Sequence, residues 1–272
     1  MTVKTVPNGV LVDKQTGFGT RLLTGWMSAV VRALNATTAA QGSIWRSQTV
    51  RVATVGAGSA LPVVLGFNVG GLGLGLTNTA PSVGTGLSLL PRLQASMAAG
   101  ATAGWNGQTN AYSLGSAAAR GGFRIESVFG VSVASAGGRA AFGLFTGAGI
   151  SLNAADPSTF VNCVFVGCDA GDANFQVMTN DAAGACAKVD TGFAKTTVDA
   201  VYRWVLEAAP NATEIAYSVE RVDVDPVVAV SGTLTADLPV NTSLMTPQWA
   251  FGGGAGPNFG CAFTRLVGES PY

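Results

Sequence analysis

The sequence predicts an all-β protein, an antiparallel β-sandwich preceded by an N-terminal arm that contains a short helix. From residue 121 onward, short runs of apolar and alternating residues are separated by turn residues, with no helical pattern between them. Residues 1–55 differ, because they carry one helical pattern. A chain of 272 residues has room for one large β domain and an arm.

Residues 1–55 are expected to form an anchoring or assembly arm. Apolar residues recur at helical spacing over 20–35, and Arg21 and Arg32 lie off the apolar stripe. This helix either packs on its own domain or docks on a larger assembly, since the pattern is the same in both cases. The candidate assembly residues are Leu22, Leu23, Trp26, Val30 and Leu34.

Residues 56–272 are expected to form a Gly-rich lead-in followed by the sandwich. The run at 70–76 (GGLGLGL) superficially resembles a nucleotide-binding loop, but it has no GxGxxG register and no Gly-Lys-Ser/Thr after it. Alternating Gly and Leu puts the leucines on one strand face, which favours close packing against another strand or subunit.

Within the sandwich, the strands are expected at intervals typical of antiparallel folds. In the run VYRWVLEAA, for example, Tyr202, Trp204 and Leu206 share one face. Residues 169–172 and 210–211 have turn composition. The expected strands are 122–134, 140–145, 160–168, 173–179, 201–209, 213–222, 227–235 and 257–267.

The composition indicates a protein that assembles. Only 11% of residues are charged, against about 25% in typical soluble domains, and the mean hydropathy is +0.37. No run of 18 apolar residues is present, so a membrane span is not expected. Much of the surface is therefore expected to be buried by other subunits, in a homo-oligomer that is most simply a trimer.

Charge is divided between the two halves of the chain. Ten Lys and Arg against two acids give +8 over residues 1–140, and five against thirteen give −8 over residues 141–272. This division favours two ends that meet different neighbours. The basic residues are scattered rather than clustered, so nucleic-acid binding is not expected.

Several functional classes are excluded or disfavoured. The chain has no histidine, which excludes Ser-His-Asp and Cys-His catalysis and every zinc site that needs histidine. No pair among the acids stands out as glycosidase carboxyls, so an enzyme is not expected. Buried thiols are favoured over disulfides or a metal for Cys163, Cys168, Cys186 and Cys261. The first 20 residues lack the apolar core of a signal peptide.

Two candidate sites stand against structural alternatives. Asp169, Asp172 and Asn174 offer oxygens for Ca²⁺, although Asx residues in hairpin turns more often bond their own backbone. Trp249, helped by Phe251, is the best candidate for stacking on a sugar ring, because it adjoins a Gly-rich loop. The alternative is that Trp249 fills the sandwich core.

Residues 88–267 resemble a domain found in tail fibres and other virion structural proteins of tailed bacteriophages. The matching stretches are IESVFGVSVASAGGRAAFGLF (125–145), DPST (156–159), NCVFVGCDAGDANFQVMTNDAAGACAKVDTGF (162–193), LEAAPNATEIAYSVERV (206–222) and SGTLTADLPVNTSLMTPQWAFGGG (231–254). The resemblance covers about two-thirds of the chain and implies a jelly-roll sandwich similar to concanavalin-type lectins. It consists of strand and turn signatures rather than catalytic motifs.

The function that follows is that of a virion structural subunit, as a tail fibre, spike or head-decoration component that acts by assembly and also attaches to the host surface. The alternative is a receptor-binding, lectin-like protein that recognises a host-surface glycan. A tail-associated glycan hydrolase ranks third. The structural role ranks first because the composition supports it independently of the resemblance. Expected partners are other virion proteins, and no cofactor is expected unless Ca²⁺ binds.

Overall fold

The computed structural model describes residues 46–51, 77–106, 112–117, 120–147, 149–254 and 258–270, with side chains from residue 79 onward. The helix expected over 20–35, its five assembly residues and the run at 70–76 lie outside the described residues. Within the described part, no helix is long and apolar enough to cross a membrane. Of the expected arm, residues 46–51 are described, and they form a strand of the sandwich.

Strands dominate the described part of the chain, joined by turns and two short 3₁₀ helices. Their bounds are β1 Arg46–Arg51, β2 Thr77–Thr79, η1 Gly86–Leu89, β3 Arg92–Met97, β4 Thr102–Asn106, β5 Phe123–Val133, β6 Arg139–Phe145, η2 Pro157–Thr159, β7 Cys163–Cys168, β8 Asn174–Asn180, β9 Ala187–Ala194, β10 Val201–Ala208, β11 Ile215–Arg221, β12 Val228–Leu234, β13 Thr246–Gly252 and β14 Phe259–Ser270.

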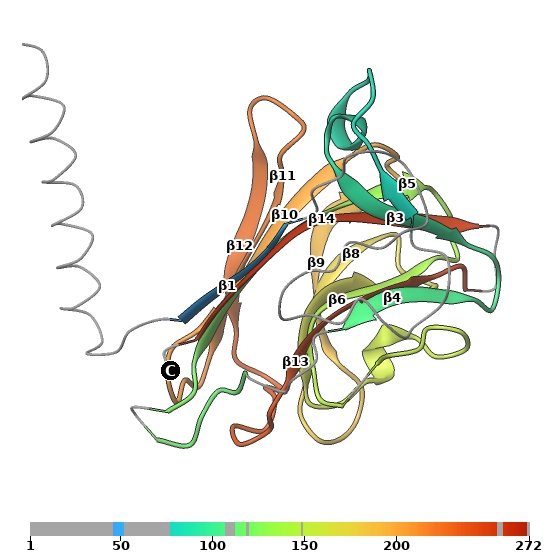
Figure 1. Cartoon of the computed structure of the whole chain (residues 1–272). Coiled ribbons are helices and arrows are strands. Elements are labelled where there is room, and N and C mark those ends of the chain that lie inside the picture. The colour runs from blue at the N-terminus through green and yellow to red at the C-terminus, as the bar shows by residue number, and fades with distance from the viewer. Residues whose placement is uncertain are drawn as a thin grey trace, which may run out of the picture. The chain divides into compact units, whose positions relative to one another are not determined.

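Two antiparallel sheets face each other, which confirms the predicted sandwich (Figure 1). The eight-stranded sheet has the order β12-β11-β10-β5-β14-β3-β2, with β1 pairing β14 off this path. The six-stranded sheet has the order β4-β13-β6-β7-β8-β9. Neighbours in each sheet are far apart in the sequence at several places, for example β5 beside β14.

The expected strands agree with the observed ones to within a few residues. The run expected over 160–168 starts later, at Cys163, because residues 157–159 form η2 and Phe160 follows it. The expected strands do not include β1 to β4, which precede residue 121, nor β9 and β13 after it. In β9, charged residues and glycine interrupt the apolar pattern, and β13 lies between a proline-containing start and a Gly-rich loop.

The core lies between the sheets and is centred on aromatic residues. Phe129 of β5 contacts Phe142 of β6 across the sandwich, with ring centroids 4.5 Å apart. The same ring lies 5.1 Å from Phe175 of β8 and 5.3 Å from Tyr202 of β10. These four residues come from both sheets, and all are buried. Their packing fixes how the two sheets face each other.

The eight-stranded sheet also has an apolar cluster on its outer face, and this cluster positions the loops described below. Leu87 of η1 packs there with Val201 of β10 and Ala262 of β14. The segment around η1 therefore lies across the outside of the sheet, near the ends of β5 and β10. A second outer cluster, which includes Phe145, Phe165 and Met178, lies on the six-stranded sheet.

Candidate functional site

The residues predicted as a calcium site are occupied by protein groups. Both carboxylate oxygens of Asp172 accept hydrogen bonds from the Lys188 ammonium at 2.9 Å, and Asp169 Oδ2 accepts one from it at 2.6 Å. The side chain of Asn174 points elsewhere and donates to Asp190 at 3.0 and 3.2 Å. A lysine supplies the positive charge beside the two aspartates, and Asn174 does not join them, so the structure does not bring the three predicted residues together. In the described part of the chain, no cluster of three or more acids and cysteines is arranged to hold a metal ion.

A second lysine lies just inside this corner. Lys195 is 1% exposed, and its ammonium donates to the carbonyl oxygens of Gly138, Asp169 and Ala170 at 3.0, 2.8 and 3.0 Å. Burial lowers the pKa of Lys195, whereas Cys168 and three nearby aspartates raise it. Hydrogen bonds between a cation and carbonyl oxygens are stronger than neutral ones. Lys195 thus holds together the loops that follow β5 and β7.

Asp156 completes the polar corner. Its carboxylate accepts a hydrogen bond from Arg139 at 2.6 Å and one from the backbone N–H of Ala170 at 3.1 Å. Burial opposes ionisation, but these hydrogen bonds and the charges of Arg139 and Lys188 together lower the pKa of Asp156. Every charged group of this corner has a partner within the protein, so the corner stabilises the fold rather than presenting a site.

The predicted sugar-stacking residues lie in the core. Trp249 is 3% exposed and Phe251 is fully buried, both in β13. The ring of Trp249 lies 5.2 Å from that of Phe142 and 5.0 Å from that of Phe251. Stacking on a sugar needs an accessible ring face, which neither side chain has in this structure, and both lie where the core alternative places them.

The cysteines are free thiols. Cys163, Cys168 and Cys261 are buried, and Cys186 is half-buried. Burial raises the pKa of Cys168 to about 12 and raises that of Cys261. The thiols of Cys163 and Cys186 both approach the carbonyl oxygen of Phe160, at 3.5 and 3.7 Å. Three of these thiols therefore behave as small apolar core residues, as the sequence indicated.

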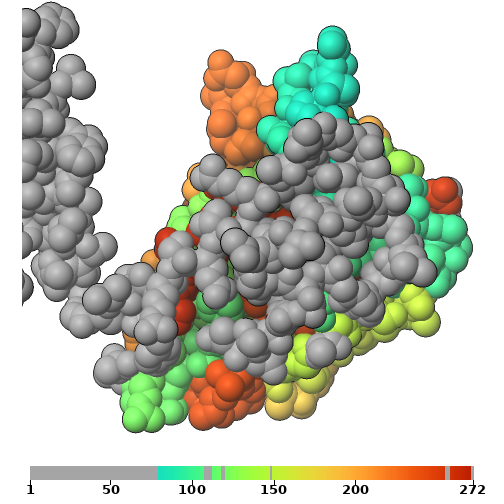
Figure 2. Space-filling model, in the orientation of Figure 1, coloured from blue at the N-terminus to red at the C-terminus, as the bar shows by residue number. Residues whose placement is uncertain are grey.

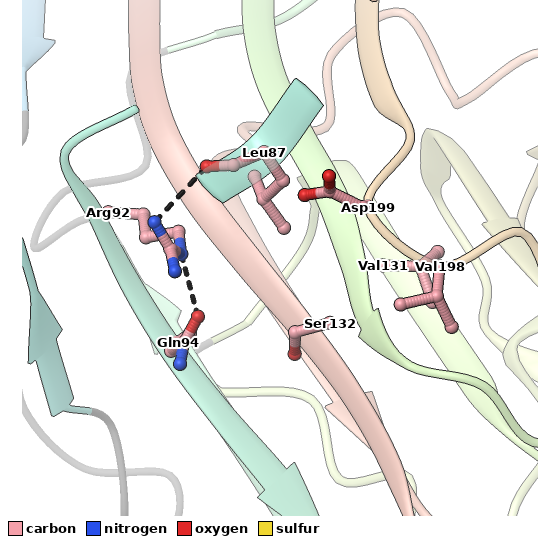
Figure 3. Close-up of a pocket in the computed structure, with 7 residues that line it drawn as sticks. All are labelled: Leu87, Arg92, Gln94, Val131, Ser132, Val198 and Asp199. Carbon is pink, nitrogen blue, oxygen red and sulfur yellow. Dashed lines mark hydrogen bonds between the residues drawn. The ribbon is translucent and has the colours of Figure 1, made fainter. Parts of the chain in front are cut away.

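A small open pocket of about 170 Å³, lined by both polar and apolar residues, lies beside η1 at one end of the eight-stranded sheet (Figure 3). Arg92 forms one side of it and donates from Nε to Gln94 Oε1 at 2.7 Å. Its Nη1 donates to the backbone carbonyls of Leu87 and Leu90 at 3.1 and 3.0 Å. Burial lowers the pKa of Arg92, although a guanidinium stays charged at neutral pH. Val198 adds an apolar, exposed wall.

Asp199, on the opposite side of the pocket, joins two loops. Its Oδ1 accepts from the backbone N–H of Ser88 at 2.9 Å, and its Oδ2 accepts from the hydroxyl of Thr85 at 3.0 Å. Its backbone carbonyl accepts from Leu87 N–H at 3.0 Å. Asp199 has a positive φ of 64°, which is uncommon outside glycine and is tolerated by aspartate. These contacts hold residues 85–88 against the loop between β9 and β10.

The hairpin of β11 and β12 ends beside the same loops. Val222 N–H donates to the carbonyl of Val201 at 2.9 Å, and Val201 N–H donates to Asp223 Oδ1 at 2.9 Å. Arg221 pairs with Asp223 at 3.0 Å, so this end of the hairpin is fixed. In Figure 2 the hairpin and the segment around residues 80–90 stand out as two neighbouring lobes at this end.

This end carries an unusual set of exposed apolar side chains, which we call the apolar rim. Val227 and Val228 are 53% and 51% exposed at the hairpin, and Val83 is fully exposed on the other lobe. Single exposed apolar residues are ordinary, but a group at one end indicates an interaction surface. The rim consists of Val83, Leu89, Val198, Val222, Val227 and Val228.

Sequence reasoning did not find the rim or the pocket. The run at 227–235 was predicted as a strand, but its position at a sheet edge depends on the order of strands, which a sequence pattern does not give. Val83 and Leu89 lie in a segment that the sequence marked only as Gly-rich. The one available signal was the valine-rich run without charge in β12.

Comparisons with known proteins find solved structures of similar fold but do not identify a family. No family model matches the chain, and no curated protein matches it. Among solved structures, lectin II from Ulex europaeus is similar with a TM-score of 0.47 and 9% identity, over 84% of this chain and 99% of that one. Peanut lectin has a TM-score of 0.42 and 10% identity, over 84% and 98%.

A third similar structure is a carbohydrate esterase from Shiga toxin-encoding bacteriophage phi24B. It has a TM-score of 0.40 and 17% identity, over 73% of this chain and 91% of that one. At these identities the likeness concerns the fold alone. That the chain is a β-sandwich follows from its own two antiparallel sheets.

Proposed function

We propose that this protein is a bacteriophage virion structural subunit, a component of a tail fibre, a spike or the head surface, that acts by assembling with other virion proteins and with copies of itself. The observation that carries the proposal is the apolar rim. Of the ten large apolar side chains that are exposed among the described residues, six, five valines and one leucine, lie at this end. Apolar side chains held on fixed loops are stabilised when another chain covers them.

Two further features support this role. Charged residues are 11% of the chain, which leaves few groups to keep an isolated subunit soluble. The resemblance of residues 88–267 to phage tail-fibre domains supplies the virion context. The proposed role needs no reactive group, and no catalytic step is included in it.

The test is whether the protein is a fixed part of the particle. Particles of the phage that encodes the chain are purified through a density gradient, washed in high salt and measured by quantitative mass spectrometry against labelled reference peptides. A constant copy number per particle, retained through the wash, is the expected result. A chain found only in the unassembled fraction of the lysate would contradict the proposal.

A second function, recognition of a host-surface glycan, is favoured by the pocket beside η1. The carboxylate oxygens of Asp199 have lone pairs beyond the hydrogen bonds that they accept from Ser88 and Thr85, so they can also accept from a sugar hydroxyl, and exposed Val198 offers an apolar contact. Saturable binding of the full chain to host envelope, competed by free glycan, is the result expected for this function. Absence of binding at millimolar glycan would exclude it while leaving the structural role intact.

A further inference from the structure

Strand β12 forms one edge of the eight-stranded sheet, and its sequence does nothing to protect that edge. Among the described strands its only hydrogen-bonded neighbour is β11. Alternate residues of an edge strand direct their N–H and C=O groups away from the sheet, where another strand can pair with them. All seven residues of β12, VAVSGTL, are uncharged, and most are exposed.

The other sheet edges differ in ways that discourage pairing. Strand β9 carries Lys188 and Asp190 on its exposed positions, and its pairing with β8 has a register shift between Asn174 and Gln176. Strand β2 is three residues long. Strand β4 is almost entirely buried. Charge, irregular pairing and short length are the usual protections of an edge, and within the described residues β12 has none of them.

The side chains of β12 also suit a partner strand of the same sequence. Val228, Val230 and Leu234 share the inner face, where Leu234 is buried, Val230 is half-buried and Val228 is 51% exposed. The outer face carries Ala229, Ser231 and Thr233. A second β12 running antiparallel would set apolar residues against apolar residues on the inner face and small ones on the outer face. No ionised side chain within either strand would face another.

We propose that two copies of this chain pair through β12, antiparallel and related by a two-fold axis that passes beside Ser231, the central residue of the strand, so that their eight-stranded sheets become continuous. The exposed valines at the start of β12 are then covered by the partner's strand and hairpin. This inference deepens the proposed assembly role, since it names the surface and the partner. A two-fold contact gives a dimer, or joins one oligomer to the next if the N-terminal segment forms a trimer.

The test compares two single lysine variants of the full chain. Ser231 lies near the middle of β12, and Ser218 is its partner on β11, on the same sheet face but one strand in from the edge. Ser231→Lys places two like charges close together across the two-fold axis, whereas Ser218→Lys adds the same charge away from it. Sedimentation velocity at several concentrations gives the dissociation constant of each.

The wild-type chain is expected to form dimers or even-numbered oligomers at about 100 μM, and Ser231→Lys is expected to raise the dissociation constant at least about tenfold, with Ser218→Lys within about twofold of the wild type. Hydrogen exchange locates the contact: amides of 228–234 should become slower to exchange as concentration rises. A monomeric wild-type chain, an unaffected Ser231→Lys variant, or protection confined to other segments would each overturn the inference.

Failure of this inference and failure of the proposed function can be told apart. A chain with a constant copy number in particles but no association through β12 would keep the virion role and remove the edge contact. A chain that dimerises through β12 but never enters particles would do the reverse. If both lysine variants dissociate the oligomer, the exchange pattern decides, since only the proposed contact protects β12 in the wild type.

Discussion

Replacement of Lys195 by methionine should destabilise the domain strongly. The buried ammonium donates to three carbonyls, and Asp169 O keeps a second partner, the N–H of Asp172 at 3.2 Å. The carbonyl of Gly138 keeps only the weak Cys168 thiol donor at 3.7 Å, so the variant leaves it and the carbonyl of Ala170 poorly satisfied. Each poorly satisfied buried group costs about 1–3 kcal/mol of folding free energy. The methionine variant no longer has to bury a charged ammonium, and the desolvation cost that it avoids offsets part of this loss. We expect a net loss of about 2–4 kcal/mol in the free energy of unfolding.

Urea unfolding followed by tryptophan fluorescence measures this loss, because Trp204 and Trp249 are buried in the core. Thermal unfolding should shift down by roughly 4–16 °C, at about 2–4 °C per kcal/mol for a domain of this size. Lys188→Met is the comparison variant, since Lys188 lies in β9, which ends one residue before Lys195, and its ammonium is partly exposed; its loss should cost less than that of Lys195, because solvent reaches the charges that it leaves. If Lys195→Met were as stable as the wild type, the carbonyl contacts would carry no net stability and the reasoning would be wrong.

Four further outcomes are expected. Adding Ca²⁺ or EDTA should leave the urea midpoint unchanged, because lysine ammoniums already neutralise the aspartate turn; a shift of the midpoint with Ca²⁺ would reinstate a metal site. A thiol reagent should modify Cys186 first in the native protein and all four cysteines after unfolding; fast reaction of the buried thiols would contradict their burial. The pKa of Asp156 is lowered in the folded state, so its ionisation stabilises the fold above about pH 4, and this stabilisation is lost as pH falls through the folded pKa. Asp156→Asn should therefore make the free energy of unfolding depend less on pH in acid; an unchanged dependence would mean that other carboxyl groups cause it. Assembly should weaken between about 0.05 and 1 M salt if the ±8 halves attract each other, and indifference to salt would remove that contribution.

The sequence predicted the sandwich well where local patterns determine the structure. The alternation of Tyr202, Trp204 and Leu206 placed their strand correctly because one face of β10 points to the core. The same logic failed for β13, which is buried along its whole length and so shows no alternation. Trp249 could be assigned to either a loop or the core from sequence, and only the packing against Phe142 decides.

Contacts between distant segments explain the remaining differences. Lys195 gives no sequence signal because its partners are backbone carbonyls, and that of Gly138 is 57 residues away. The aspartates at 169 and 172 were correctly placed in a turn, but the lysine that neutralises them comes from a strand that was not predicted. The free edge of β12 follows from the order of strands, which depends on pairing over the whole domain.

The central claim is that other chains of a particle cover the apolar rim, and hydrogen exchange measured on intact particles tests it most directly. Amides around residues 82–90 and 221–228 are compared in purified particles and in the isolated full chain, diluted until sedimentation shows a monomer. Exchange at both segments should be markedly slower in the particle, while amides of the six-stranded core strands change little. Equal rates in the two states, with the protein present in the particle, would contradict the claim.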